Sequence, residues 1–360
     1  MKNKSSLALT LLTPFLLLNC SGKNTQASPL PTTMPSNNPS VLTPTTNRPS
    51  LGEPIYIPSS TPSIIQEEPI PNSRPVQQHP VAHGKSSLSK KLKLPNVIKE
   101  TSGLIKIDNR LWTMNDSGGK PKLYQIDERN GRILKSIHIQ NARNKDWEDI
   151  AYDDNYVYIG DFGNNRGNRK DLKIYKIPRA SLSTQKSVRA EVIDFKYSDQ
   201  KNFNFKAYKH NYDCEAMVAH NGKLYLFSKN WQNQKTRLYE LSSHAGKHQA
   251  KYLSTFNTQG MVTGATLNKE LNILLLTTYS SFSNLNFLNV KVWAFTNFNN
   301  QNFFSGDKKK LNFRSTLQAQ VEGITFTGNY KAYFSSEAFR KYIFSFDASL
   351  YELDFSEEFE

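Results

Sequence analysis

Glutamates recur at matching points in three segments of this 360-residue chain. They stand in Asp146-Trp-Glu-Asp-Ile-Ala151, in Asp213-Cys-Glu-Ala-Met217 and in Val321-Glu-Gly-Ile324. Carboxylates at close quarters repel one another unless a cation or shared protons intervene. Carboxylate oxygens are also ligands that Ca²⁺ binds well. If the fold brings the segments together, we expect them to bind Ca²⁺ or another divalent cation. The expected metal ligands are Glu148, Asp149, Glu215 and Glu322.

Polar residues at the ends of predicted strands are candidates for ligand binding. Asn115-Asp-Ser-Gly118 ends one strand, and Asp161 begins a loop that runs to Arg169. This loop superficially resembles a calcium loop, but Leu172 stands where an EF-hand requires a bidentate glutamate. The candidate ligand-binding residues are Asn115, Asp116, Asp161, Asn164, Arg166 and Glu337.

A structural role is the alternative for each of these carboxylates. An Asp or Glu at the start of a strand can accept hydrogen bonds from the backbone N–H groups of a neighbouring sheet, and Asn-Asp-Ser-Gly is an ordinary turn sequence. Both roles can coexist in one group of residues, so both remain open.

These residues belong to a unit that recurs after Lys90. The unit is a polar or acidic residue, a small residue, an apolar strand, a turn, a second strand and a polar cluster. One instance leads from Glu100-Thr-Ser-Gly-Leu104 to Leu111-Trp-Thr-Met-Asn-Asp-Ser-Gly118. A third and a fourth strand follow, as in Lys122-Leu-Tyr-Gln-Ile126 and Ile133-Leu-Lys-Ser-Ile-His-Ile139, so each unit predicts a four-stranded meander.

Five meanders in series, each unable to cover both of its faces alone, predict an all-β fold. The expected architecture is a β-propeller of five four-stranded blades. A sixth blade is the alternative, either within the long interval between Glu148 and Glu215 or completed from the chain ends. In an antiparallel blade the first strand starts where the second strand ends, so we expect the polar clusters to converge on one face around the axis.

The same motifs resemble those of a family of exported bacterial β-propeller proteins, near the SdiA-regulated group and the phytase-like and NHL-like propellers. The resemblance covers about residues 95–350. The Asp146-Trp-Glu-Asp-Ile-Ala151 string is its most specific part. It implies a propeller fold and export and allows a bound cation, but it implies no particular reaction.

The N-terminal segment predicts export and lipid attachment. Met1-Lys-Asn-Lys4 is basic, and Leu7 to Leu18 form an apolar stretch too short to span a membrane, so residues 1–19 fit a signal peptide. The end of this stretch resembles the bacterial lipobox, in which the cysteine is acylated, here Cys20; Asn19 departs from the usual small residue. Cleavage further along, with Cys20 incidental, is the alternative. We expect the protein in the cell envelope, on the outer membrane if the cell is Gram-negative.

Composition separates a tether from the folded domain. Thirteen of the 17 prolines lie between Pro29 and Pro80, so residues 20–88 predict a disordered Pro/Ser/Thr-rich linker and residues 89–360 the propeller. The net charge of +15 raises the question of nucleic-acid binding. However, residues 1–99 hold ten Lys and Arg against three Asp and Glu, and the remaining excess is scattered. We therefore expect no nucleic-acid partner and a monomer.

Familiar catalytic signatures such as His-Glu-x-x-His, Gly-x-Ser-x-Gly and a phosphate loop are absent from the sequence. The first functional hypothesis is therefore a lipid-anchored propeller that binds a small molecule, polymer or protein of the envelope on its acidic face. A metal-dependent hydrolase, either a phosphoesterase or a lactonase, is the second. A scaffold that holds Ca²⁺ only for stability is the third.

Overall fold

The computed structural model describes residues 86–280, 289–313, 319–341 and 344–359. The expected signal peptide, Cys20 and nearly all of the linker lie outside these residues. None of the helices in the described part of the chain has the length and hydropathy of a membrane span. The described residues belong to one compact unit, Val76–Glu360.

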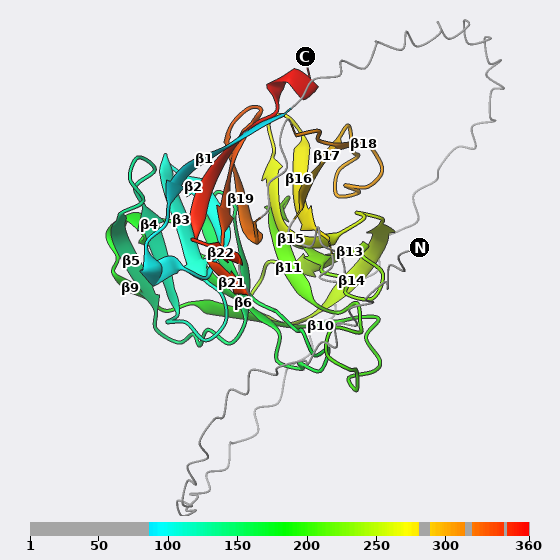
Figure 1. The fold of residues 1–360 in the computed structure, drawn as a ribbon. Coiled ribbons are helices and arrows are strands. Elements are labelled where there is room, and N and C mark those ends of the chain that lie inside the picture. Colours follow the sequence, from blue (N-terminus) through cyan, green and yellow to red (C-terminus); the bar gives the residue numbers. More distant parts are fainter. Residues whose placement is uncertain (1–85, 281–288, 314–318, 342–343, 360) are drawn as a thin grey trace, which may run out of the picture. The chain divides into compact units, whose positions relative to one another are not determined.

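Antiparallel sets of four strands follow one another along the chain (Figure 1). The first set is β2 (Thr101–Ile107), β3 (Arg110–Asn115), β4 (Lys122–Ile126) and β5 (Ile133–Ile139). The second set is β6 (Trp147–Tyr152), β7 (Tyr156–Asp161), β8 (Lys173–Pro178) and β10 (Glu191–Tyr197). The third set is β11 (Cys214–His220), β12 (Lys223–Ser228), β13 (Thr236–Ser242) and β14 (Gly246–Phe256).

The later sets repeat this order. They are β15 (Met261–Asn268), β16 (Ile273–Tyr279), β17 (Val290–Thr296) and β18 (Asp307–Lys310), and then β19 (Val321–Gly328), β20 (Lys331–Ser336), β23 (Ser349–Asp354) and β1 (Ser87–Lys93). A hairpin of β21 (Phe339–Lys341) and β22 (Phe344–Phe346) lies between β20 and β23 in sequence. The remaining elements are η1 (Asn96–Ile98), α1 (Ser181–Thr184), β9 (Ser187–Val188) and η2 (Ser356–Glu358).

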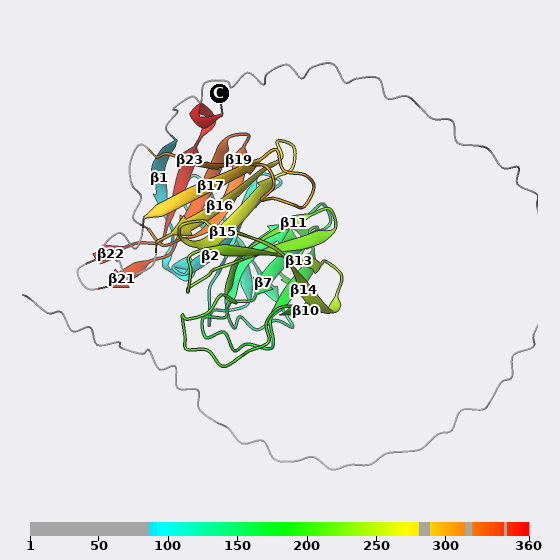
Figure 2. The ribbon, with the colours of Figure 1, turned by 90° about the vertical axis from the view of Figure 1, so that its right-hand side faces the viewer.

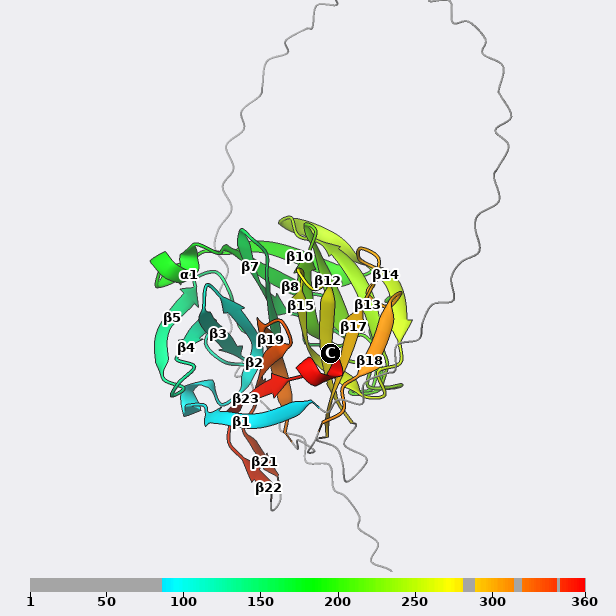
Figure 3. The same ribbon diagram turned by 90° about the horizontal axis from the view of Figure 1, so that it is seen from above.

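The first strands of the sets form a closed ring. β2 contacts β6, β6 contacts β11, β11 contacts β15, β15 contacts β19, and β19 returns to β2. The other strands of each set continue outward from this ring, as the view from above shows (Figure 3). The all-β propeller fold predicted from the repeat is therefore confirmed.

Residues from both ends of the described chain share one sheet. β1 pairs antiparallel with β23, so the strand that begins at the end of the predicted linker becomes the outer strand of the last set (Figure 2). A second link joins two outer strands, because β10 and β14 pair in parallel and merge the second and third sets into one eight-stranded sheet.

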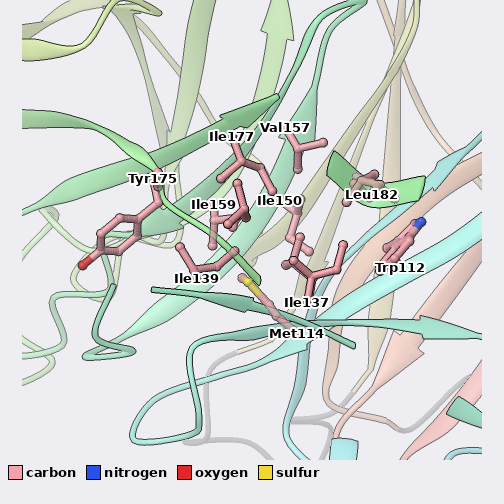
Figure 4. Close-up of a cluster of buried hydrophobic side chains, with 14 of the residues drawn as sticks. Trp112, Met114, Ile137, Ile139, Ile150, Val157, Ile159, Tyr175, Ile177 and Leu182 are labelled. Carbon is pink, nitrogen blue, oxygen red and sulfur yellow. The ribbon is translucent and has the colours of Figure 1, made fainter. Parts of the chain in front are cut away.

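Hydrophobic clusters of the described residues lie between neighbouring sets all the way round the ring. Between the first two sets, Trp112 and Met114 of β3 pack with Ile150 of β6 and Ile159 of β7 (Figure 4). Each sheet is thus covered on both faces by its neighbours. Removing these side chains from water is the main force that holds the sets together.

Candidate functional site

A β-bulge interrupts the first strand of every set near its start. The pairing register shifts at these places: Ser102/Leu104, Trp147/Asp149, Cys214/Ala216, Val262/Gly264 and Val321/Gly323. Glu148, Glu215 and Glu322 are the unpaired bulge residues of their strands, and each is only 4% exposed. A bulge re-aims side chains out of the strand's regular alternation. It therefore gives these three glutamates the same placement at one end of the ring.

A repeated backbone hydrogen bond defines the neighbouring positions. The N–H of a residue just after the second strand donates to the carbonyl of the residue just before the first strand. The pairs are Asp116 with Glu100 (2.8 Å), Gly163 with Asp146 (3.1 Å), Lys229 with Asp213 (2.9 Å) and Glu337 with Gln320 (2.9 Å). This hydrogen bond identifies four structurally equivalent positions after the second strand of a set, which are Asp116, Gly163, Lys229 and Glu337.

Three carboxylates could hold a metal ion at this end of the ring. One carboxylate oxygen from each of Asp116, Asp146 and Glu148 lies within 4.8 Å of the others. Gly163 makes the arrangement possible, because a Cβ there would collide with Oε1 of Glu148 and lie 2.5 Å from Oδ2 of Asp146. Within the described residues, the Asp146 and Glu148 carboxylates accept no hydrogen bond and form no ion pair.

Burial and neighbouring negative charges disfavour ionisation of the three carboxyl groups of this triad. Burial raises the pKa of Asp116 to about 6, although the Ser117 N–H and the Lys229 charge act to lower it. Burial, followed by repulsion from Asp116 and Asp213, raises the pKa of Asp146 to about 7. Burial and then the Asp116 charge raise the pKa of Glu148 well above its usual range. A bound cation would relieve this repulsion.

Lys229 supplies positive charge to a second group of acidic residues, which adjoins the triad and consists of Glu215, Glu322 and Glu337; the triad and this group together are the acidic cluster. Its Nζ lies 3.0 Å from Oε2 of Glu215, and both side chains are buried. The same Nζ is 5.2 Å from the Tyr279 ring centroid. Burial lowers the pKa of Lys229, but the Glu215 carboxylate and then Tyr279 and Glu322 outweigh it and hold this pKa well above its usual value. Lys229 therefore remains charged and opposes the burial that raises the pKa of Glu215 well above its usual range.

Glu322 and Glu337 belong to the same group. The Tyr279 hydroxyl donates to Oε1 of Glu322 at 3.5 Å, while Oε2 of Glu322 is buried and has no hydrogen bond from the described residues. Burial raises the pKa of Glu322 to about 7, with Lys229 opposing. Glu337 accepts a hydrogen bond from Nε2 of Gln320 at 2.7 Å, and burial and then the Glu322 charge raise its pKa well above the usual range.

Asp149, an expected metal ligand, takes the structural role instead. Its Oδ2 accepts the Met217 N–H at 2.7 Å, and its Oδ1 accepts the Ile150 N–H at 2.8 Å. Met217 belongs to β11, so Asp149 ties β6 to the next strand of the ring. The alternative of a carboxylate that satisfies backbone donors of a neighbouring sheet therefore describes this residue.

Two of the expected ligand-binding residues are engaged in structural contacts on the loop after β7. Asp161 forms a buried ion pair with Arg169 (2.8 Å). The Asn164 side chain donates to the Tyr212 carbonyl and accepts the Arg169 N–H, both at 2.9 Å. Arg166 is exposed to solvent.

Of the first-set candidates, Asp116 belongs to the triad, and Asn115 precedes it at the end of β3. Nδ2 of Asn115 donates to the Val97 carbonyl at 2.8 Å. Cys20 lies outside the described residues. The structure thus brings Asp116, Glu148, Glu215, Glu322 and Glu337 to one end of the ring.

Sequence reasoning overlooked the roles of Gly163, Lys229 and Tyr279. The Asp-x-Glu spacing shared by Asp146-Trp-Glu148 and Asp213-Cys-Glu215 offered one signal. A lysine directly follows the second strand of one unit, whereas a phenylalanine and a glycine follow that strand in the other, which indicates that one acidic pair lacks a lysine counterion. Tyr279 carries no comparable sequence signal.

No protein-family model matches this chain, and no curated protein matches it. Among solved structures, it is similar to the PQQ-bound aldose sugar dehydrogenase of Streptomyces coelicolor, with 11% identity, 76% of this chain and 99% of that chain covered, and a TM-score of 0.42. It is also similar to a proposed 6-phosphogluconolactonase of Bacteroides uniformis, with 12% identity, coverage of 68% and 65%, and a TM-score of 0.34. At these values neither neighbour informs the site.

Proposed function

We propose that this protein is an exported β-propeller that binds a divalent cation at Asp116, Asp146 and Glu148 and uses the loaded site to hold an envelope ligand. The observation that carries the proposal is the Glu148 carboxylate, which is buried beside two further carboxylates and has no hydrogen bond or ion pair in the described residues. A buried charge without a partner is costly, and a cation is the partner that removes the cost.

Ca²⁺ suits this site best. The ligands are all carboxylate oxygens, without the sulfur or imidazole groups that zinc and copper prefer. Ca²⁺ takes six to eight oxygens, so three carboxylates leave coordination positions for backbone carbonyls, water or oxygens of a ligand. A ligand that presents hydroxyl, carbonyl or carboxylate oxygens would complete the shell.

The place of action in this proposal comes from the N-terminal sequence. A basic start, an apolar stretch and Cys20 support export followed by acylation, and the motif resemblance to exported bacterial propellers supports the same location. The linker of residues 20–88 would then tether the propeller to the envelope membrane. Its length would let the binding end of the ring reach ligands away from the lipid surface.

Calorimetric titration of the purified propeller with Ca²⁺ tests the cation site. We expect one bound Ca²⁺ per chain, and we expect Glu148→Gln to weaken binding at least tenfold. Glu191→Gln is the matched control, because Glu191 is an exposed glutamate on the outer strand β10. Absence of Ca²⁺, Mg²⁺ and Mn²⁺ binding by the wild-type protein would rule out the proposal, as would equal affinities for the two variants.

Metal-dependent hydrolysis is a second candidate, favoured by Glu322. Its pKa of about 7 and its buried Oε2, which has no hydrogen bond in the described part of the chain, are properties of a general base that works near neutral pH. The Ca²⁺-, Mg²⁺- or Mn²⁺-loaded protein should then hydrolyse bis(p-nitrophenyl) phosphate or a simple lactone, and Glu322→Gln should abolish turnover while cation binding remains. If the loaded wild type shows no turnover of either substrate, binding without reaction is the function.

A further inference from the structure

Two aromatic side chains lie at the border of the acidic cluster. Trp231 follows β12, two residues beyond Lys229, and Tyr208 lies between β10 and β11. Their ring centroids are 4.6 Å apart with the planes at 67°. Tyr208 is 48% exposed, and Trp231 is partly exposed. Both members of this aromatic pair are therefore partly open to solvent.

The same charged residues that form the cluster hold Trp231 in place. Nε1 of Trp231 donates to Oδ2 of Asp213 at 2.6 Å, and Asp213 is fully buried. The Lys229 ammonium lies 5.1 Å from the centroid of the Trp231 ring. Because Lys229 is also ion-paired with Glu215, the indole borders the acidic cluster directly. With its N–H bonded to Asp213 and the Lys229 ammonium over its ring, Trp231 has only its remaining, partly exposed ring surface to offer a ligand.

Tyr208 is held in an unfavourable backbone conformation. Its φ is 60°, in the left-handed region that bulky residues rarely adopt, and its N–H donates to the Asn165 carbonyl at 2.9 Å. Glycine or asparagine would occupy this position with less strain. Backbone preference therefore does not explain a tyrosine here whose ring is half exposed. Such strain is typical of residues that position a ligand.

We propose that Trp231 and Tyr208 form a stacking subsite for a saccharide. This inference names the ligand class of the cation-dependent binding proposed above, and it rests on that function for the polar contacts of the saccharide. A pyranose ring has apolar C–H faces that pack on aromatic rings, while its hydroxyls donate to carboxylates and coordinate divalent cations. This subsite presents both kinds of surface side by side.

The charges beside the subsite disfavour nucleic acids, which are the main alternative to a saccharide. Carboxylate oxygens of Asp116, Asp146 and Glu148 lie within 4.8 Å of one another, and the Asp213 carboxylate accepts the indole N–H, so negative charge gathers beside the subsite. A nucleic acid would be repelled by this charge, despite the stacking that its bases could provide. A neutral or weakly charged saccharide meets no such barrier.

The test is a glycan array of neutral, uronic-acid and amino-sugar oligosaccharides, probed with the full propeller in Ca²⁺ and followed by calorimetry on the best binder. Tyr208→Gly removes the ring at a position that suits glycine, so we expect it to weaken glycan binding roughly tenfold without lowering the melting temperature. Trp231→Ala should weaken binding at least as much. Tyr252→Ala is the control, because Tyr252 is an exposed tyrosine on β14 and should leave binding unchanged.

Calcium binding measured on the same samples separates this inference from the proposed function. If the protein binds Ca²⁺ but no glycan on the array, the saccharide subsite is overturned and the cation site stands. If a glycan binds in a way that depends on both aromatic residues but Ca²⁺ does not bind, the subsite stands and the proposed function fails. Glycan binding that survives both Tyr208→Gly and Trp231→Ala overturns the subsite as well.

Discussion

Gly163 and Lys229 hold equivalent positions in neighbouring sets of strands, but only Lys229 provides a counterion for the glutamate of its set. Each N–H donates to the carbonyl of the aspartate that precedes the set, at 3.1 Å and 2.9 Å. Lys229 places an ammonium 3.0 Å from Glu215, whereas Gly163 has no side chain to offer and Glu148 has no counterion among the described residues. The protein supplies its own cation to one acidic pair, and the other pair has room for an external one.

Gly163→Ala should reduce cation affinity at least tenfold while the propeller still folds. The added Cβ would collide with Oε1 of Glu148 and crowd Oδ2 of Asp146, both at the ends of side chains that can turn away. Displacing two of three ligands removes the geometry that a divalent cation needs. Calorimetric titration with Ca²⁺ measures the change. Gly328→Ala is the control, because a Cβ there meets only Cβ of Lys331 at 3.9 Å; equal affinities for the two variants would contradict the site.

Lys229→Met should destabilise the propeller by roughly 3–5 kcal/mol, because it leaves the Glu215 carboxylate buried and unpaired. Urea unfolding measures this loss. Removing the internal ammonium also makes the second acidic pair resemble the first, so we expect added Ca²⁺ to raise the unfolding midpoint of the variant more than that of the wild type. A variant as stable as the wild type would show that the Lys229–Glu215 pair contributes nothing.

Asp149→Asn should lower the free energy of unfolding by about 1–3 kcal/mol and leave Ca²⁺ affinity unchanged. Both Asp149 oxygens accept backbone N–H groups, from Ile150 and Met217, and an amide can accept only one of these bonds. Urea unfolding and calorimetry on one preparation give the two quantities. Loss of Ca²⁺ binding at unchanged stability would return Asp149 to the metal ligands.

The fold was accessible from the sequence because each unit carries its own local signals. Alternating apolar residues and turns such as Asn221-Gly222, where both residues have positive φ, specify the hairpins without reference to the rest of the chain. Five similar units then leave few ways to cover both faces of every sheet. The convergence of Glu148, Glu215 and Glu322 at one end of the ring followed from that architecture.

The partners of individual carboxylates were not accessible in this way. Glu148 and Asp149 are adjacent in sequence, yet a bulge places one in the acidic cluster and directs the other to the backbone of β11. Sequence alternation does not reveal where a bulge falls. The role of Lys229 likewise depends on where the end of β12 lies relative to the start of β11, which only the register determines.

Cys20→Ala should release the protein from membranes when the full chain is expressed with its signal in a bacterial host. Without the thiol no lipid can be attached. Once the signal peptide has been cleaved, the remaining residues before the propeller hold no apolar stretch long enough to anchor the chain. Fractionation and detergent partitioning measure the change. Cys214→Ala keeps Cys20 and should remain in the membrane fraction; membrane retention of Cys20→Ala would argue against acylation.

In the presence of chelator, the propeller should become less stable as the pH rises from about 5 to 8. Folding raises the pKa of Asp116 to about 6 and the pKa values of Asp146 and Glu322 to about 7, whereas the unfolded groups titrate near pH 4. Between these values the folded chain binds more protons than the unfolded chain, so the free energy of unfolding falls with rising pH. Ca²⁺ binds the deprotonated carboxylates and should reduce or reverse the fall. Urea midpoints at several pH values, with chelator and with Ca²⁺, measure both effects. A midpoint that rises with pH in chelator would mean that positive groups of the folded protein already pair with these carboxylates and lower their pKa values.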